Sequence, residues 1–362
     1  MSYPLTEHIR KEKRPFVIAG PCSAESEEQM QVIAADLARD SKVKLLRAGI
    51  WKPRTRPDSF SGIGQAGLKW LVDAGRQNGL PVCTEVANRE HVEDALKAGV
   101  DVLWIGARTS VNPFTVQEIA DVLRGVEIPV MVKNPINPDL NLWIGALERL
   151  EKSGIKELTA IHRGFSIYQH RKYRNVPNWE LPIALKERFQ ELPLICDPSH
   201  IGGKRSLLRE ISQKAMDLNF DGLMIETHPS PEQALSDAEQ QITADELNDL
   251  LSHLVLRSAE IRAGHAETID DLREKIAILD DRVFELLSAR MDISSELGHF
   301  KRDHHITILQ TEHWKNMIDS RLNKSADYGL TRRFIRQVMD AIHQESIRRQ
   351  TKIMNEKEDQ KR

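Results

Sequence analysis

The stretch Phe16-Val17-Ile18-Ala19-Gly20-Pro21-Cys22 sets the pattern for the first two thirds of this chain: a short apolar run that ends in a reactive or polar side chain. Parallel strands that alternate with helices form a (β/α)8 barrel, and such barrels carry their chemistry at the carboxyl ends of the strands. We therefore expect an α/β fold, a (β/α)8 TIM barrel, with its active site at the ends of eight runs. The other seven are residues 43–46 before Arg47, 81–84 before Glu85, 102–105 before Arg108, 129–132 before Lys133, 158–161 before Arg163, 192–195 before Asp197 and His200, and 222–225 before Glu226.

The composition is that of a globular protein with balanced charge. The 51 Lys and Arg against 54 Asp and Glu leave a net charge of −3, so we expect neither a nucleic-acid nor a membrane partner. Three widely spaced cysteines argue against a disulfide framework and for a reducing, cytoplasmic location. Residues 1–14 are polar, and no apolar run is long enough to cross a bilayer, so we expect no signal peptide and no membrane span.

A second, all-helical domain is predicted after the strand pattern stops near Ile242. One helical stretch is expected over residues 244–262, with a break at 263–265, and three helices over about 268–303, 309–324 and 330–354, with Gly329 in the last turn. Three helices bury their apolar stripes poorly alone, so we expect a homodimer through this domain, with a tetramer as an alternative. The predicted domains are a barrel over 1–255 with its core from about residue 14, a linker over 256–265, a helical domain over 266–354 and a polar tail over 355–362.

Four side chains at or after the first, seventh and eighth strand ends form a candidate metal site: Cys22, His200, Glu226 and Asp237. One thiolate, one imidazole and two carboxylates suit Mn²⁺, Fe²⁺, Co²⁺ or Zn²⁺. The alternative is a small buried cysteine, a turn-capping histidine and a helix-capping aspartate. Taken in isolation the two interpretations are evenly matched, and the barrel context favours the metal. Cys83 and Cys196 are expected to be packing residues.

Six cations also lie at or just after strand ends, and they would repel one another unless a substrate brought negative charge. Arginine binds phosphate and carboxylate with two parallel hydrogen bonds, and lysine adds a point charge. We therefore expect small, strongly anionic substrates. The alternative, surface ion pairs with helix carboxylates, suits any one of them better than all six together. The six are Arg47, Lys52, Arg54, Arg108, Lys133 and Arg163.

These clusters, in this order, resemble 3-deoxy-D-arabino-heptulosonate 7-phosphate (DAHP) synthase of type I-beta over roughly residues 14–255. The resemblance implies an aldol-like condensation of phosphoenolpyruvate with erythrose 4-phosphate and release of phosphate. The related 3-deoxy-octulosonate 8-phosphate synthases share the barrel but lack the Lys-Pro-Arg-Thr loop, so they rank second. The matching segments are residues 20–25 (GPCSAE), 52–55 (KPRT), 105–108 (IGAR), 161–164 (IHRG), 197–200 (DPSH), 224–229 (MIETHP) and 234–237 (ALSD).

The same resemblance implies roles for the barrel residues. The divalent metal, Mn²⁺ before Fe²⁺, Co²⁺ or Zn²⁺, is expected on the four ligands named above, as a Lewis acid toward the aldehyde oxygen of erythrose 4-phosphate. Lys52 and His200 are the candidates for proton transfer. In the substrate site, Arg108 and Arg163 would bind the phosphate of phosphoenolpyruvate. Its carboxylate side would be bound by Arg47, Lys52 and Lys133, with Glu85 close by. The phosphate of erythrose 4-phosphate would be bound by Arg54 and Thr55, and Ala107 and Asp197 would make further substrate contacts.

The helical part contains residues 272–276 (LREKI), 279–280 (LD), 286–290 (LLSAR) and 345–350 (ESIRRQ), with Lys301 three helical turns after Arg290. Through these segments, residues 266–352 resemble an AroQ-type chorismate mutase. The resemblance implies that Arg290 and the partner subunit's Arg273 clamp the two carboxylates of chorismate. Lys301 would bond the ether oxygen, and Ser346 and Gln350 would complete the pocket. The sequence departs from the family where Gln310, His313 and Trp314 replace an acidic residue and an Arg-Glu pair.

The expected function is therefore bifunctional: DAHP synthesis in the barrel and rearrangement of chorismate to prephenate in the helical domain. Binding of prephenate or chorismate to the helical domain is expected to inhibit the synthase. The alternative is a DAHP synthase with a non-catalytic helical domain that senses a ligand or dimerises.

Overall fold

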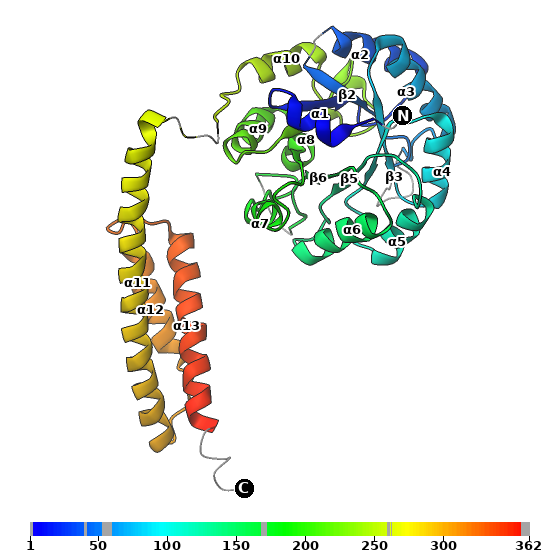
Figure 1. The fold of residues 1–362 in the computed structure, drawn as a ribbon. Helices are drawn as coiled ribbons and strands as arrows, with labels where there is room; N and C mark the ends of the chain where they lie inside the picture. The colour runs from blue at the N-terminus through cyan, green and yellow to red at the C-terminus, as the bar shows by residue number, and fades with distance from the viewer. Residues whose placement is uncertain are drawn as a thin grey trace. The chain divides into compact units, whose positions relative to one another are not determined.

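The chain folds into two compact units, residues 1–259 and 260–362, in a computed structural model (Figure 1). The structure describes residues 3–39, 42–52, 60–167, 172–258, 261 and 263–355. Each unit is described by itself below.

Eight parallel strands close the first unit into a barrel in the order β1 to β8, and β8 pairs back with β1. Every predicted run is a strand, with bounds shifted by at most two residues, so the predicted TIM barrel is confirmed. The strands are β1 (Phe16–Gly20), β2 (Val43–Arg47), β3 (Val82–Val86), β4 (Val102–Ile105), β5 (Val130–Lys133), β6 (Leu158–His162), β7 (Leu194–Cys196) and β8 (Gly222–Glu226).

Helices surround the strands, as Figure 1 shows. Most of them begin with a side chain that accepts a backbone N–H, as Asn88 does from His91 and Thr243 from Glu246. The helices of this unit are α1 (Leu5–Lys11), α2 (Glu27–Ala38), α3 (Gln65–Asn78), α4 (Arg89–Ala98), α5 (Pro113–Val122), α6 (Leu140–Lys152), α7 (Glu180–Arg188), α8 (Pro198–Gly202), α9 (Leu208–Asp217) and α10 (Ala244–Ser252), with the 3-10 turns η1 (Arg205–Leu207), η2 (Pro231–Gln233) and η3 (Ala238–Gln240).

The strands are buried on both faces, which is why they read as continuous apolar runs. Alternate residues along β1 enter different clusters: Phe16 and Ile18 lie inside the barrel, and Val17 and Ala19 pack against the helices. Cys83 lies in the inner cluster and Cys196 in the outer one, and both are buried free cysteines.

Helix α1 closes the amino-terminal end of the barrel, although residues before 14 were expected to lie outside its core. Leu5 and Ile9, one helical turn apart, are buried in the inner cluster. Thr6 donates from its N–H and its hydroxyl to Glu157, which stands just before β6. The barrel core therefore begins near residue 5.

Helix α10 ends at Ser252, so the predicted helix over 244–262 is wrong in its second half. The side-chain amide of Gln213 bonds both the N–H and the C=O of Val255, each at 2.9 Å. Arg14 donates to the carbonyl of Arg257 at 2.7 Å. These side chains from distant parts of the barrel satisfy backbone groups that a longer helix would have used.

The second unit consists of α11 (Ala263–Asp303), α12 (Thr311–Asn323) and α13 (Arg332–Asn355). The break expected at residues 263–265 is wrong, because they form the first turn of α11. Gly329 has φ +64° in the turn before α13, as predicted. The core of this unit is small: Ile318, Leu322 and Ile335 form its buried cluster.

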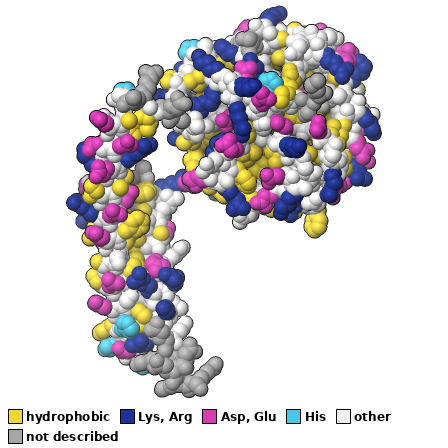
Figure 2. Space-filling model, in the orientation of Figure 1, with side chains coloured by type: hydrophobic (Ala, Val, Ile, Leu, Met, Phe, Trp, Pro, Cys, Tyr) yellow, Lys and Arg dark blue, Asp and Glu magenta, His cyan; other side chains and the backbone are white. Residues whose placement is uncertain are grey.

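The amino-terminal half of α11 leaves its apolar stripe open. Leu272, Ile276, Leu279 and Val283 are each more than half exposed, and hydrophobic side chains are visible along this unit in Figure 2. None of the described helices combines the length and the hydrophobicity that a membrane span requires.

Candidate functional site

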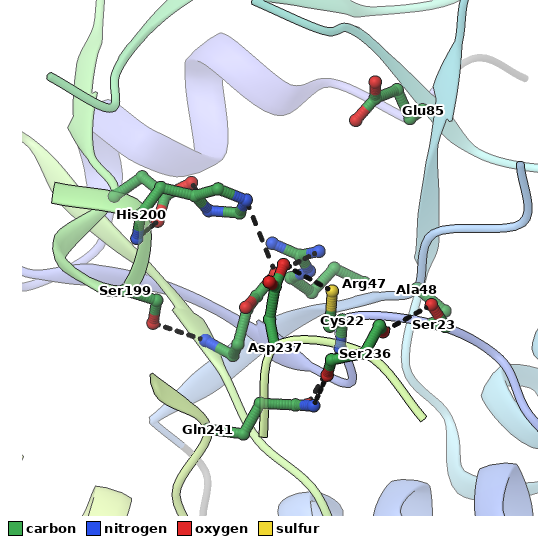
Figure 3. A network of polar contacts seen from close by, with 12 residues as sticks. Cys22, Ser23, Arg47, Ala48, Glu85, Ser199, His200, Ser236, Asp237 and Gln241 are labelled. Carbon is green, nitrogen blue, oxygen red and sulfur yellow. Dashed lines mark hydrogen bonds and ion pairs between the residues drawn. The ribbon is translucent and has the colours of Figure 1, made fainter. Parts of the chain in front are cut away.

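Three of the four predicted metal ligands converge at the carboxyl ends of β1 and β8 (Figure 3). The ligand atoms of Cys22, Glu226 and Asp237 lie within 4.8 Å of one another. Cys22 follows β1, Glu226 ends β8, and Asp237 enters from the segment between η2 and η3 with φ +50°. The sulfur of Cys22 lies 3.4 Å from Oδ2 of Asp237.

The fourth predicted ligand, His200, lies beside this group without joining it. Its Nε2 is 3.8 Å from Oε1 of Glu226, and its Nδ1 is 2.8 Å from Oδ2 of Asp197. The short helix α8 holds it there, since Asp197 caps this helix by accepting the N–H of His200. Asp197 thus fixes the orientation of the imidazole and leaves Nε2 directed at the carboxylate cluster, as Figure 3 shows.

The donor set fits a borderline divalent cation. Oε1 of Glu226 is buried and, within the described ranges, accepts no hydrogen bond, although Nη2 of Arg47 lies 3.1 Å away. Burial, and then the charge of Glu226, raises the pKa of the Cys22 thiol to about 12. A cation at this point would stabilise the thiolate and bind the carboxylate oxygen that accepts no hydrogen bond.

Arg47 and Lys133 are fully buried, and both are paired with carboxylates. Arg47 faces Glu226, and Nζ of Lys133 lies 2.8 Å from Oδ2 of Asp197. Both cations also lie over the ring of Trp104, at 5.0 and 5.6 Å from its centroid. Burial alone would raise the pKa of Asp197, but His200 and Lys133 outweigh burial and hold it well below its usual value.

A cavity of about 440 Å³ opens beside the carboxylate cluster and is lined by cations. Burial lowers the pKa of Arg163 to about 10, so its guanidinium still carries its charge at neutral pH. Arg47 and Lys52 are not among the lining residues. Five predicted substrate contacts do line the cavity: Glu85, Ala107, Arg108, Lys133 and Arg163. The other lining residues are the predicted metal ligand His200 and four residues that were not predicted: Ile136, Ser166, Arg174 and Asn175.

Glu85 is held against the wall of this cavity. Nε1 of Trp104 donates to its Oε2 at 2.9 Å. A Cβ at Gly106 would come within 2.1 Å of Oε1 of Glu85, so the glycine of the IGAR motif is what allows the carboxylate to approach.

Lys52 lies at the cluster of candidate metal ligands, with Nζ 3.1 Å from the sulfur of Cys22 and in contact with its carbonyl oxygen. Arg54 and Thr55, the predicted ligands of the second phosphate, lie outside the described residues.

The sequence analysis missed Arg174. Its Nη1 lies 2.9 Å from Oδ1 of Asp237 and 2.8 Å from Oε1 of Gln240. Burial alone would raise the pKa of Asp237, but Arg174 and His200 hold it below its ordinary value. Arg174 follows no apolar run, so the strand-end signal that found the other cations could not find it.

A larger cavity, of about 910 Å³, lies at the opposite end of the barrel, among residues that precede β6 and β7. Three acidic side chains balance three basic ones there, and it contains none of the predicted site residues. The chemistry therefore belongs to the smaller cavity at the carboxyl ends.

The helical unit has its own cavity, of about 500 Å³, and it brings four of the five predicted mutase residues together. They are Arg290 and Lys301 on α11 and Ser346 and Gln350 on α13. Nη1 of Arg290 donates to Oγ of Ser346 at 2.9 Å. A Cβ at Gly298 would lie 3.1 Å from Cγ of Gln350, so this glycine lets α11 and α13 approach closely.

The departures from the mutase pattern also line this cavity: Gln310, His313 and Trp314. The ring of Trp314 stacks on His343, with centroids 3.6 Å apart and planes 11° apart. Arg273 is elsewhere on α11, exposed and paired with Asp270.

A barrel whose strand ends hold a cation-lined cavity beside a thiol and carboxylate cluster defines an enzyme for small anionic substrates. The chain belongs to the DAHP synthetase I family, whose model matches residues 4–261, and the model of chorismate mutase type II matches residues 272–351. The two activities are accordingly DAHP synthase and chorismate mutase.

Individual relatives agree with this assignment. A phospho-2-dehydro-3-deoxyheptonate aldolase of Thermotoga maritima is 31% identical over 66% of this chain and 68% of its own. A 2-dehydro-3-deoxyphosphooctonate aldolase of Variovorax paradoxus is 28% identical over 74% and 94%. A crystal structure of the DAHP synthase from T. maritima superimposes with a TM-score of 0.59 at 30% identity, covering 66% of this chain and 67% of that one.

Proposed function

We propose that the barrel condenses phosphoenolpyruvate with erythrose 4-phosphate at the cation-lined cavity, with a divalent metal, Mn²⁺ first, held by Cys22, Glu226, Asp237 and His200. The observation that carries this proposal is the juxtaposition of that cavity with the thiol and carboxylate cluster: His200 lines the cavity, and its Nε2 lies 3.8 Å from Oε1 of Glu226 in the cluster. When bound, the metal supplies Lewis-acid polarisation of the aldehyde.

The chain's own residues bind and orient the two anions. Arg108 and Arg163 are the groups for the phosphate of phosphoenolpyruvate, and Lys133 for its carboxylate. Arg47 does not line the cavity, and its role is to balance the negative charge of Glu226. His200 and Lys52 are the groups nearest the cluster that can move a proton. Because the pocket neutralises both substrates, it removes the repulsion that keeps them apart in water.

The test is phosphate release from the two substrates by the full chain. Arg108→Gln should raise the KM for phosphoenolpyruvate about tenfold or more, through loss of a charge-assisted contact. Arg124→Gln, an exposed arginine paired with Asp121, is the control and should match the wild type. Equal kinetics of all three proteins would contradict the placement of the substrate.

In the helical unit, we propose that Arg290 and Lys301 bind one carboxylate and the ether oxygen of chorismate, and that Arg273 of the partner subunit completes the site. The open stripe on α11 supports a homodimer. Leu279→Asp with Val283→Asp should give a monomer by sedimentation and abolish mutase turnover. Ile278→Asp, exposed on the same helix but outside the stripe, should remain dimeric and active. A dimeric, active double variant would overturn this arrangement.

We also propose that prephenate bound in the helical pocket inhibits the synthase. The synthase rate of the full chain should fall as prephenate is added, and Arg290→Ala with Lys301→Ala should remove that response. Equal insensitivity in both proteins would rule out regulation through this pocket.

A non-catalytic sensing domain is the second candidate, favoured by the tryptophan at position 314. Loss of chorismate absorbance with the full chain separates the two, because a sensor binds chorismate without consuming it.

A further inference from the structure

His343 occupies a place in the mutase cavity that neither the sequence motifs nor the proposed mechanism uses. It lies on α13 three residues before Ser346 and seven before Gln350, which puts all three on one face of the helix. It is half-buried and lines the same cavity. Trp314 stacks on it and so fixes the plane of the imidazole.

The cavity is rich in donors and poor in strong acceptors. Arg290 and Lys301 are its cations, and none of its described lining residues is an Asp or a Glu. The hydroxyl of Ser346 already accepts from Arg290 and donates to the carbonyl of Ile342. The dianionic substrate also carries a ring hydroxyl, whose proton needs an acceptor once water is excluded.

We propose that His343 is a catalytic residue of the mutase site, and that a ring nitrogen of its imidazole accepts the hydrogen bond of the substrate's ring hydroxyl. Over the part of the chain that the structure describes, neither ring nitrogen of His343 has a hydrogen-bond partner. Of the other polar lining groups, Gln310 and His313 are exposed at the edge of the cavity, and Ser294 accepts from Nε2 of Gln350 at 3.1 Å. Oε1 of Gln350 is a second buried acceptor, two helical turns along α13 from His343, and has no partner among the described residues.

The electrostatics favour the neutral, accepting form of this histidine. Burial lowers the pKa of His343, Arg290 and Lys301 lower it further, and Asp340 opposes them. His313 is the other titratable group of the lining, on α12. At neutral pH the imidazole therefore presents a lone pair without adding a charge to the cations that hold the carboxylates.

This inference rests on the proposed mutase function, and two variants of the full chain test it. His343→Phe preserves a ring against Trp314 but removes the acceptor, and should lower kcat/KM for chorismate about tenfold, the value of one hydrogen bond. His343→Asn restores an acceptor and should recover most of that loss. Wild-type kcat/KM should fall as acid protonates His343, and this fall should be absent from His343→Asn.

His299→Asn is the matched control, since it changes an exposed histidine on α11 that does not line the cavity and should keep both the rate and the acid limb of the wild type. Wild-type-like kinetics in His343→Phe, or an equal loss in His343→Phe and His343→Asn with the acid limb retained, would overturn the role of His343 and leave the mutase intact. A wild-type protein that consumes no chorismate would overturn the mutase site and this role together. Thermal unfolding of each variant separates a misfolded protein from an inactive one.

Discussion

At the scale of the residue, the sequence predicted which charged groups gather but not which of them pair. Arg47 and Lys133 were expected to bind the anionic substrate, yet Arg47 is already paired with Glu226 and Lys133 with Asp197. Strand periodicity places such side chains at one rim, but pairing depends on distances across the barrel that no local pattern encodes. Buried pairs of this kind relieve the repulsion expected of a ring of cations.

His162 gives a pH-dependent prediction at this scale. It is buried among Trp143, Phe165, Trp179 and Phe220, and burial, followed by the charge of Arg163, lowers its pKa to about 3. The unfolded chain therefore takes up a proton near pH 6.5 that the folded chain refuses, so stability falls as the pH drops below 6.5.

The variant His162→Phe removes this difference in proton uptake. Between pH 6.5 and 5, the wild type should lose about 2 kcal/mol more of its unfolding free energy than the variant does. Urea unfolding at the two pH values measures the difference. Equal losses in the two proteins would show that His162 is not held neutral.

At the scale of the element, strands were predictable and helix ends were not. Each strand is a short apolar run with a polar end, whereas α10 ends at Ser252 and the side chains of Gln213 and Arg14 bind the backbone of the residues after it. Helix α1 was not predicted from the sequence, because Leu5 and Ile9 are its only buried residues and they lie in an otherwise polar segment. Arg174 was missed for a related reason, since it follows no strand.

Helix α1 should be necessary for the stability of the barrel rather than an appendage. Leu5→Ala removes a fully buried side chain from the inner cluster and should cost about 2–5 kcal/mol of unfolding free energy. Arg10→Ala, on the same helix, breaks an exposed ion pair with Glu191 and an exposed hydrogen bond to its carbonyl oxygen, and should cost less, about 1 kcal/mol. Denaturant unfolding measures both variants. Equal losses of unfolding free energy would contradict the role of α1 in closing the amino-terminal end of the barrel.

At the scale of the whole molecule, two chemistries with different requirements share one chain. The sequence predicted both through resemblance to known families, carried by the strand-end motifs in the barrel and by Arg290, Lys301 and Gln350 in the helical part. It also predicted the loss of the acidic residues of the family, and no Asp or Glu is found among the described residues that line the mutase cavity. It could not show that Trp314 stacks on His343 there.

Removal of divalent cations should therefore separate the two activities. Excess EDTA should lower the synthase rate at least about a hundredfold, since the carboxylates and thiol would lose the ion that we propose they hold. The mutase rate should not change, because among the described residues only the barrel has a cluster of metal-ligating side chains. Synthase assays after adding Mn²⁺, Fe²⁺, Co²⁺ or Zn²⁺ would rank the metals, and an EDTA-sensitive mutase would contradict this separation.

The stacked pair in the helical cavity also has an optical consequence. Of the six tryptophans, five lie at positions 51–179 and only Trp314 lies beyond the barrel. Its indole is in contact with His343, and a protonated imidazole quenches indole fluorescence. Replacing the five barrel tryptophans by phenylalanine would leave a single tryptophan, at the wall of the mutase cavity, that can be excited apart from the four tyrosines. Its emission would report occupancy and protonation there in real time, without a label and without turnover.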